Sequence, residues 1–174
     1  PETRHASWDK SLWSVGTRYN ASPSFAVYAN AGTSFMAPAA KQIGGTVPIP
    51  SASGELANPD LKPESGLGRD LGFDWQTSST VSLGARLFMN SIDDAIVSNV
   101  VSAAPSQTRS ENAGKARAAG LEIDVRYTPS KDLTCFANTT LTRTKVRHTS
   151  NPDQDGTDIP FVPDGVANLG LSTT

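Results

Sequence analysis

A short polar segment is the clearest candidate for metal chemistry in this chain. Residues 151–156 read Asn-Pro-Asp-Gln-Asp-Gly, which matches the first half of an EF-hand calcium loop. A bidentate glutamate closes that loop at position twelve, but position twelve here is Val162, and no helical pattern flanks the segment. We therefore interpret residues 151–156 as a polar loop and assign no metal-binding residue.

The other groups capable of catalysis are few and isolated. The two histidines, His5 and His148, are too few for a zinc cluster, and no G-x-S-x-G elbow exists to complete a Ser/His/Asp triad with His148. The Gly-Leu-Gly of residues 66–68 lacks the helix that a dinucleotide fingerprint requires. Cys135 falls among alternating apolar residues and is interpreted as a small hydrophobic residue. We predict no enzyme activity and assign no catalytic or cofactor-binding residue.

Composition sets further limits on the class of protein. The length of 174 residues suggests about one domain, and the single cysteine excludes an internal disulfide. A net charge of -2 provides no basic footprint, so no nucleic-acid partner is expected. The chain contains no run approaching the ~18 apolar residues of a transmembrane helix. A membrane-spanning β-barrel needs only about half of its residues apolar, so the composition leaves a membrane location open.

Apolar and polar residues alternate along most of the chain, which predicts β-strands because successive side chains of a strand point to opposite faces. No segment shows a convincing helical period. The predicted strands are residues 12–20, 24–35, 64–77, 80–101, 107–128, 132–146 and 164–174.

Short and long connections alternate between these predicted strands. The short turns are residues 21–24, 77–80 and 129–132, and the longer loops are residues 37–62, a segment near 102–110 and residues 147–162. This arrangement predicts an antiparallel up-and-down meander, because all short turns then lie at one end of the sheet. The Pro, Gly and Ser content of residues 39–57 favours a mobile loop over a packed element.

The position of aromatic and basic residues bears on the medium that the apolar face contacts. Aromatic residues of this face lie within about three residues of a short turn, as in the interfacial girdle of a membrane barrel: Tyr19, Phe25, Trp75 and Tyr127. Arg69 and Arg143 interrupt the apolar face toward the long-loop end, where an interface would tolerate them. The alternative is a soluble β-sandwich binding or adhesin module, which would bury Leu71, Leu83 and Ile123.

Several motifs, in order along the chain, resemble those of TonB-dependent outer-membrane receptors. Residues 35–38 and 58–64 resemble the block F-x-A-P … N-P-x-L-x-P-E, and Asp70-Leu71-Gly72 stands where the family usually has E-x-G or E-L-G. The other three resemblances are I-x-D-x-I at residues 92–96, N-x-G-x-A … G-x-E at residues 112–122, and I-P-x-V-P at residues 159–163.

This resemblance implies a 22-stranded barrel with an N-terminal plug in its lumen. It implies a receptor in the outer membrane of a Gram-negative-type bacterium that imports a scarce ligand with energy from the TonB complex. The expected ligand is most often a ferric siderophore and sometimes haem, cobalamin or a sugar. Residues 1–174 are then expected to be a partial barrel domain, about a third of the strands, without the plug domain through which TonB would act.

The expected partners follow from the two faces of such a barrel. The apolar face would contact outer-membrane lipid. The inward charges would face a plug and trapped water: Asp70, Asp74, Arg86, Glu122, Asp124 and Arg126. Loop cations could attract an anionic siderophore, although solvated charges are the simpler interpretation: Lys41, Lys62, Arg109, Lys115 and Arg147. The ligand-binding residues themselves are not assigned.

Overall fold

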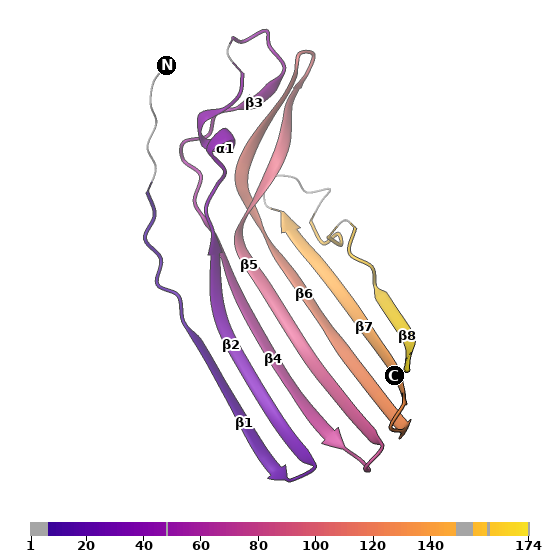
Figure 1. Ribbon diagram of the computed structural model, residues 1–174. Helices are drawn as coiled ribbons and strands as arrows, with labels where there is room; N and C mark the ends of the chain where they lie inside the picture. The colour runs from indigo at the N-terminus through magenta and orange to yellow at the C-terminus, as the bar shows by residue number, and fades with distance from the viewer. Residues whose placement is uncertain (1–6, 48, 149–154, 160, 174) are drawn as a thin grey trace.

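The chain folds as one curved sheet of long antiparallel strands (Figure 1). The computed structural model describes residues 7–47, 49–148, 155–159 and 161–173. The elements are β1 (Ser14–Ser22), β2 (Phe25–Met36), α1 (Ala40–Gly44), β3 (Gly54–Leu56), β4 (Glu64–Gln76), β5 (Val81–Ala103), β6 (Ser106–Ser130), β7 (Leu133–His148) and β8 (Gly165–Thr173). In the part of the chain that the structure describes, no helix has the length and apolar character needed to cross a membrane.

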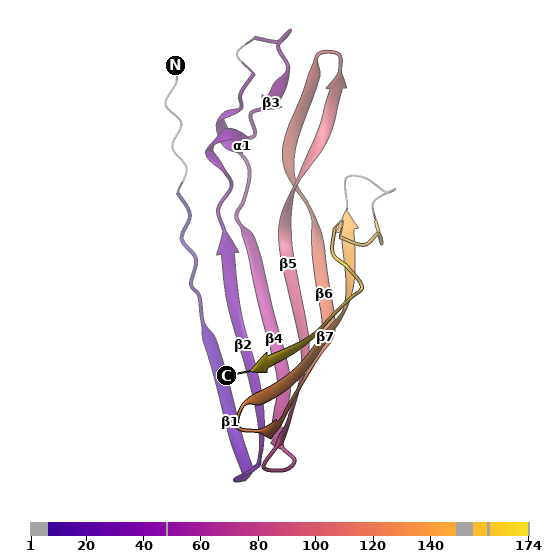
Figure 2. The same cartoon turned by 45° about the vertical axis from the view of Figure 1, so that its right-hand side comes forward.

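The strand order confirms the predicted meander. Neighbours in the sheet run β1-β2-β4-β5-β6-β7-β8, and each pair along this path is antiparallel. The short β3 is an addition that the sequence pattern did not predict, and it pairs in parallel with β6. The short turns lie together at the lower end of Figure 1, and Figure 2 shows β7 and β8 curving forward out of the plane of the other strands.

The predicted loop near residues 102–110 is wrong. β5 and β6 continue through it as one hairpin of 23 and 25 residues, joined only by Ala104 and Pro105. Polar residues in this region suggested a loop, but they pair across the two strands instead. The side chain of Asn99, for example, donates to the carboxylate of Glu111 at 3.1 Å. A two-stranded ladder in water can carry polar residues on both faces, so its alternation between apolar and polar is weak.

One face of the sheet is apolar and uncovered. Leu71, Leu87, Leu121 and Leu141 lie side by side in one row across β4 to β7. Leu71 and Leu87 are each 57% exposed, and in the described chain the only hydrophobic residues classed as buried are Ala26 and Leu61. Among the residues that the structure describes, no second layer packs on this face, so they form no sandwich core. The sandwich alternative, which required burial of Leu71, Leu83 and Ile123, is wrong.

The opposite face carries the predicted inward charges, and several pair with neighbouring strands. Arg18 forms an ion pair with Asp74 at 2.6 Å, and Arg86 forms one with Glu122 at 2.7 Å. The side chain of Asn30 donates to Asp70 at 2.8 Å. These cross-strand pairs satisfy charged groups on the wall itself.

Glycines on this polar face make room for large neighbours. A Cβ atom at Gly72 would lie 2.5 Å from the ring of Tyr28, and one at Gly120 would lie 2.6 Å from the ring of Phe88. The rings of Tyr28 and Phe88 therefore reach over the glycines of the adjacent strands. This close approach is what glycine in a strand permits.

The aromatic residues of the apolar face gather at the short-turn end, as predicted. Trp75 lies opposite Phe25, and their rings meet edge to face with centroids 6.4 Å apart. Tyr127 lies opposite Val81, at the start of β5. Offset and edge contacts of this kind add to area burial, and their location marks the expected lower boundary of the apolar band.

We predict that two adjacent threonines of β7 respond differently to the same substitution in the intact barrel. Thr139 shares a row with Ile123 on the apolar face, whereas Thr140 faces the carboxylate of Glu122 on the polar face. Thr139→Arg should destabilise the barrel by roughly 2–4 kcal/mol, the cost of an arginine near the bilayer midplane. Thr140→Arg gains an acidic neighbour and serves as the matched control. Unfolding by denaturant in lipid vesicles measures both, and equal losses would show that the faces are assigned wrongly.

Candidate functional site

Three of the sequence motifs meet in space at the long-loop end of the sheet. The Asn112 amide nitrogen donates to the backbone oxygens of Lys62 and Asp94, each at 2.8 Å, and its amide oxygen accepts the Lys62 backbone N–H at 2.7 Å. The Glu64 carboxylate accepts the backbone N–H of Ile96 at 2.7 Å. We call this group, with Asn58 and Leu61, the motif junction. It ties the end of the segment before β4 to the middle of the β5–β6 hairpin.

The backbone bends where the motif junction holds β5. The register between β5 and β6 shifts around residues 92–96, and Asp94 adopts a left-handed conformation with φ 57°. Aspartate tolerates this conformation better than most residues, because its short polar side chain can bond locally. The bulge releases the Asp94 carbonyl from the ladder, and the side-chain amide of Asn112 donates a hydrogen bond to that carbonyl instead.

A second cluster of hydrogen bonds surrounds Ser110 on β6, the most buried side chain described, at 1% exposed. Its hydroxyl donates to Glu55 of β3 at 2.5 Å and accepts from the Gln42 amide of α1 at 3.3 Å. The Asn58 amide donates to the Ser110 carbonyl oxygen at 2.8 Å. Gln107, also buried, donates to the backbone oxygens of Pro50 and Ala52, each at 2.8 Å.

The prediction of an unpacked loop at residues 39–57 is therefore wrong. The segment contains α1 and β3 and lies against the upper part of β6. The segment shows no apolar periodicity in its sequence. It is nevertheless packed, because polar contacts with β6 hold it in place. Leu61, four residues beyond this segment, is also buried, at 3% exposed. The sequence pattern could not predict this packing, since the partners of the segment lie about fifty residues away in sequence.

The five predicted loop cations do not form one site. Lys41 lies 3.9 Å from Glu55. Lys115 and Arg147 lie in β6 and β7 rather than in loops, and they face each other in the register on the apolar side of the sheet. The Nε atom of Arg109 is buried without a hydrogen-bond partner in the described structure. These placements do not support joint capture of an anionic ligand by all five cations.

The predicted polar loop falls largely outside the described residues. Residues 151–154 and His5 are not described, and His148 is the last residue of β7. Asp155, at the described end of this segment, lies 3.9 Å from Arg147. Across the described ranges, no group of three or more His, Cys, Asp or Glu side chains could hold a metal ion.

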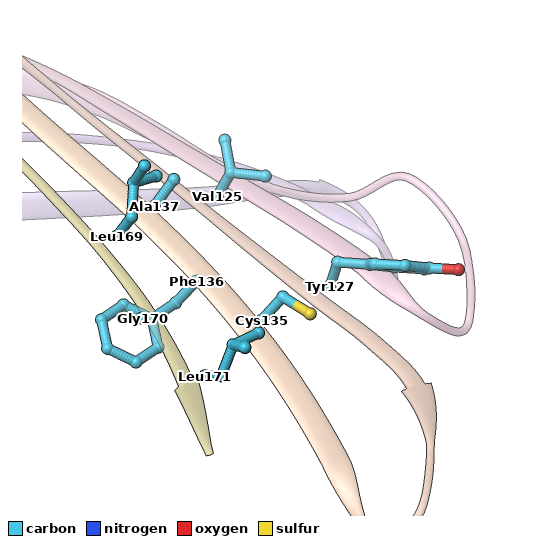
Figure 3. Close-up of a pocket in the computed structure, with 8 residues that line it drawn as sticks. All are labelled: Val125, Tyr127, Cys135, Phe136, Ala137, Leu169, Gly170 and Leu171. Atoms are coloured by element: carbon cyan, nitrogen blue, oxygen red, sulfur yellow. The ribbon is translucent and has the colours of Figure 1, made fainter. Parts of the chain in front are cut away.

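Cys135 lies on the apolar face, as predicted for a small hydrophobic residue. It is a free thiol that is partly exposed, opposite Tyr127 and Leu171. Figure 3 shows these residues at a shallow hollow over β6, β7 and β8. The hollow is lined by Val125, Tyr127, Cys135, Phe136, Ala137, Leu169, Gly170 and Leu171. None of these side chains is charged, so the hollow suits apolar contacts and contains no acid–base pair.

Comparison with protein families assigns the chain. A family model described as the β-barrel of TonB dependent receptor-like proteins matches residues 2–174. The chain belongs to the TonB-dependent receptor family. Members of this family are β-barrels of the bacterial outer membrane, so the predicted family, fold class and location are confirmed. In barrels of this kind the apolar face contacts lipid and the polar face lines the lumen.

This chain matches only part of the length of each similar protein. The vitamin B12 transporter BtuB of Vibrio vulnificus (strain CMCP6) is 35% identical over 96 residues, which is 54% of this chain and 14% of that protein. The siderophore receptor PirA from Acinetobacter baumannii has a TM-score of 0.69 at 21% identity, over 91% of this chain and 26% of that one. The copper transporter OprC has a TM-score of 0.67 at 21% identity, over 91% and 23%. The chain thus spans from 14% to 26% of the length of these proteins.

Sequence reasoning identified part of this site. Asn58, Glu64 and Asn112 lie within the quoted motifs, but nothing in the sequence indicated that the motifs contact one another. Gln42, Glu55, Gln107 and Ser110 were not singled out. The available signal was the run of polar residues at 107–112 within a segment predicted as a strand, because buried polar side chains on a strand require partners.

We predict that Asn112→Ala loosens the attachment of the segment before β4, around Lys62, without disrupting the membrane strands. The variant loses hydrogen bonds to both backbone groups of Lys62 and to the Asp94 carbonyl, each worth about 1 kcal/mol net. Hydrogen exchange at the Lys62 amide, measured in the full-length receptor, should accelerate by roughly 30-fold or more. Asn168→Ala is the control, because it removes a single bond to Asn138 on the wall. Unchanged exchange at Lys62, or equal acceleration in the control, would contradict the anchoring role.

Proposed function

We propose that residues 1–174 are part of the barrel wall of an outer-membrane receptor that takes up a scarce, metal-bearing ligand with energy from TonB. The observation that carries this proposal is the sheet of this chain, which is apolar on one face and charged on the other. Its exposed leucine rows suit lipid, while the ion pairs of Arg18 with Asp74 and Arg86 with Glu122 suit a wet lumen. A wall of this kind encloses a path for a ligand and has no need of a catalytic group.

We further propose that the lumen wall contacts a plug domain outside this chain. The ion pairs leave other polar groups of the same face for such a contact: Asn20, Asp124 and Arg126 are exposed, and Asn138 and Asn168 bond to each other on the same side. A plug that fills the lumen would transmit the pull of TonB. In this proposal, residues 1–174 form the fixed wall that contacts the plug, and the plug is the part that TonB moves.

A ferric siderophore is the proposed ligand, and cobalamin is the second candidate. PirA is one of several similar structures named as receptors or transporters of siderophores or other ferric chelates, and this recurrence supports the first candidate. The vitamin B12 transporter BtuB supports the second, since it is a relative with 35% identity over 96 residues. In both cases the anchored segment 39–62 would stand beside the entrance to the lumen, at the end opposite the short turns.

The proposal is tested by uptake into cells that lack their own receptors for siderophores and vitamin B12. The full-length receptor should restore uptake of radiolabelled ferric siderophores from a panel that includes catecholate, hydroxamate and citrate chelates. Uptake should disappear in a matched strain without TonB, because transport against a gradient through a plugged barrel requires that energy.

Each result of this assay decides one part of the proposal. Uptake of cyanocobalamin with no siderophore would replace the first ligand with the second. Uptake that persists without TonB would contradict the energised mechanism. Absence of uptake of every probe, with surface protein matched to a positive control, would contradict the transport assignment.

A further inference from the structure

The lipid-facing side of the sheet changes character toward the long-loop end of β6 and β7. Leu121 and Leu141 form the last apolar row. The rows above it carry five cations, here called the basic patch: Lys115, Arg117, Arg143, Lys145 and Arg147. All five side chains are exposed. This number of cations on one outward surface is unexpected for a wall that contacts only hydrocarbon.

The register places the basic patch on the lipid side and not in the lumen. Between Gly114 and Tyr127, β6 pairs with residues 135–148 of β7 without a shift. Side chains two residues apart therefore stay on one face, and Arg117 and Lys145 lie on the same face as Leu121 and Leu141. Exposure alternates in the same way along β7, where Arg143, Lys145 and Arg147 are exposed and the residues between them are partly buried.

The height of the basic patch matches the outer surface of the membrane. Ten residues of β6 separate Tyr127, in the aromatic row at the short turns, from Arg117. At about 3.3 Å per residue and a tilt of about 40°, they span roughly 25 Å, the height of the apolar band of such barrels. Arg117 and Lys145 therefore lie where lipid headgroups begin, on the side away from the short turns.

The charges of the basic patch are only partly compensated by the chain. Arg117 lies directly opposite Lys145, and Lys115 lies directly opposite Arg147. Like charges in such positions repel each other. Lys115 pairs with Asp93 at 2.9 Å, and Arg147 lies 3.9 Å from Asp155. Arg117, Arg143 and Lys145 form no ion pair with any residue that the structure describes.

We propose that the basic patch binds the phosphate-bearing headgroup of a lipid of the outer leaflet. A phosphate between Arg117 and Lys145 would relieve their repulsion through charge-assisted hydrogen bonds, and the acyl chains would lie on the leucine row below. The surface is hollowed at this height, with a volume of about 700 Å³. Its charged lining residues are two acids and four cations: Asp93, Asp94, Lys115, Arg117, Lys145 and Arg147. The lipid is a bound component of the wall, separate from the ligand that passes through the lumen.

The test uses the purified full-length receptor in a zwitterionic detergent. Three probes are compared by native mass spectrometry: lipid A with both phosphates, the same lipid after dephosphorylation, and inorganic phosphate as a competitor. The variant Arg117→Gln/Lys145→Gln removes two charges from the basic patch. The control Lys41→Gln/Lys131→Gln removes the same charge from α1 and from a short turn, where both side chains are exposed.

Phosphorylated lipid A should bind the wild type, and the patch variant should bind it about 30-fold more weakly, since each cation near a charged lipid surface contributes a factor of roughly five. The control variant should bind like the wild type. The patch variant without lipid should be at least as stable to heat as the wild type, because a repulsive pair is gone, and should gain less stability from the lipid.

Other outcomes overturn the proposal. Equal binding of the dephosphorylated lipid would show that acyl chains alone are held. Competition by inorganic phosphate at the lipid's own concentration would show a phosphate site without lipid preference. Equal weakening in the control would show that net charge, rather than the patch, drives binding. The charge-conserving variant Arg117→Lys/Lys145→Arg keeps the test valid if the glutamine variant fails to assemble, since loss of binding there would contradict electrostatic recognition.

Discussion

The structure depends on the pairing of backbone groups along an unbroken antiparallel ladder. Hydrocarbon offers no partner for an N–H or C=O group, so a strand in lipid must bond to its neighbours over the full apolar band. From β1 to β8 the register is continuous across the band, and its irregularities between β5 and β6 fall outside it, around residues 92–96 and 100–102. Once the ladder is fixed, the alternation of side chains assigns every residue to lipid or lumen without a packed core.

The part of the fold within the membrane was predictable from the sequence because each side chain there contacts either lipid or the lumen, and its polarity matches that medium. The seven main strands and the inward charges followed from the alternation of side chains, and the strand order followed from the alternation of short turns and long loops. The part above the membrane was not predictable in the same way. There, the β5–β6 hairpin contacts water and the polar groups of residues 39–58 and does not contact lipid. The alternation that marks a strand is therefore weak, and a loop was predicted in its place.

The candidate site shows a similar division. Asn58 and Asn112 were recognised as motif residues, but the contacts that give them a role join segments far apart in the chain. Ser110 is the clearest case, since a serine on a strand carries no signal of being 1% exposed. The basic patch was visible in the sequence only as scattered lysines and arginines. It becomes one surface when the β6–β7 register brings Arg117 beside Lys145.

The location of the Ser110 contacts gives the order of strand assembly a consequence for residues 39–62. Residues 39–62 lie between β2 and β4 in the chain, yet their partners Gln107, Ser110 and Asn112 belong to β6. If strands join the sheet from the N-terminal side, this segment waits unanchored while β4, β5 and β6 are added. If they join from the C-terminal side, its docking surface is complete before it arrives. The direction of insertion thus decides whether this stretch of polypeptide spends part of its biogenesis exposed to periplasmic proteases.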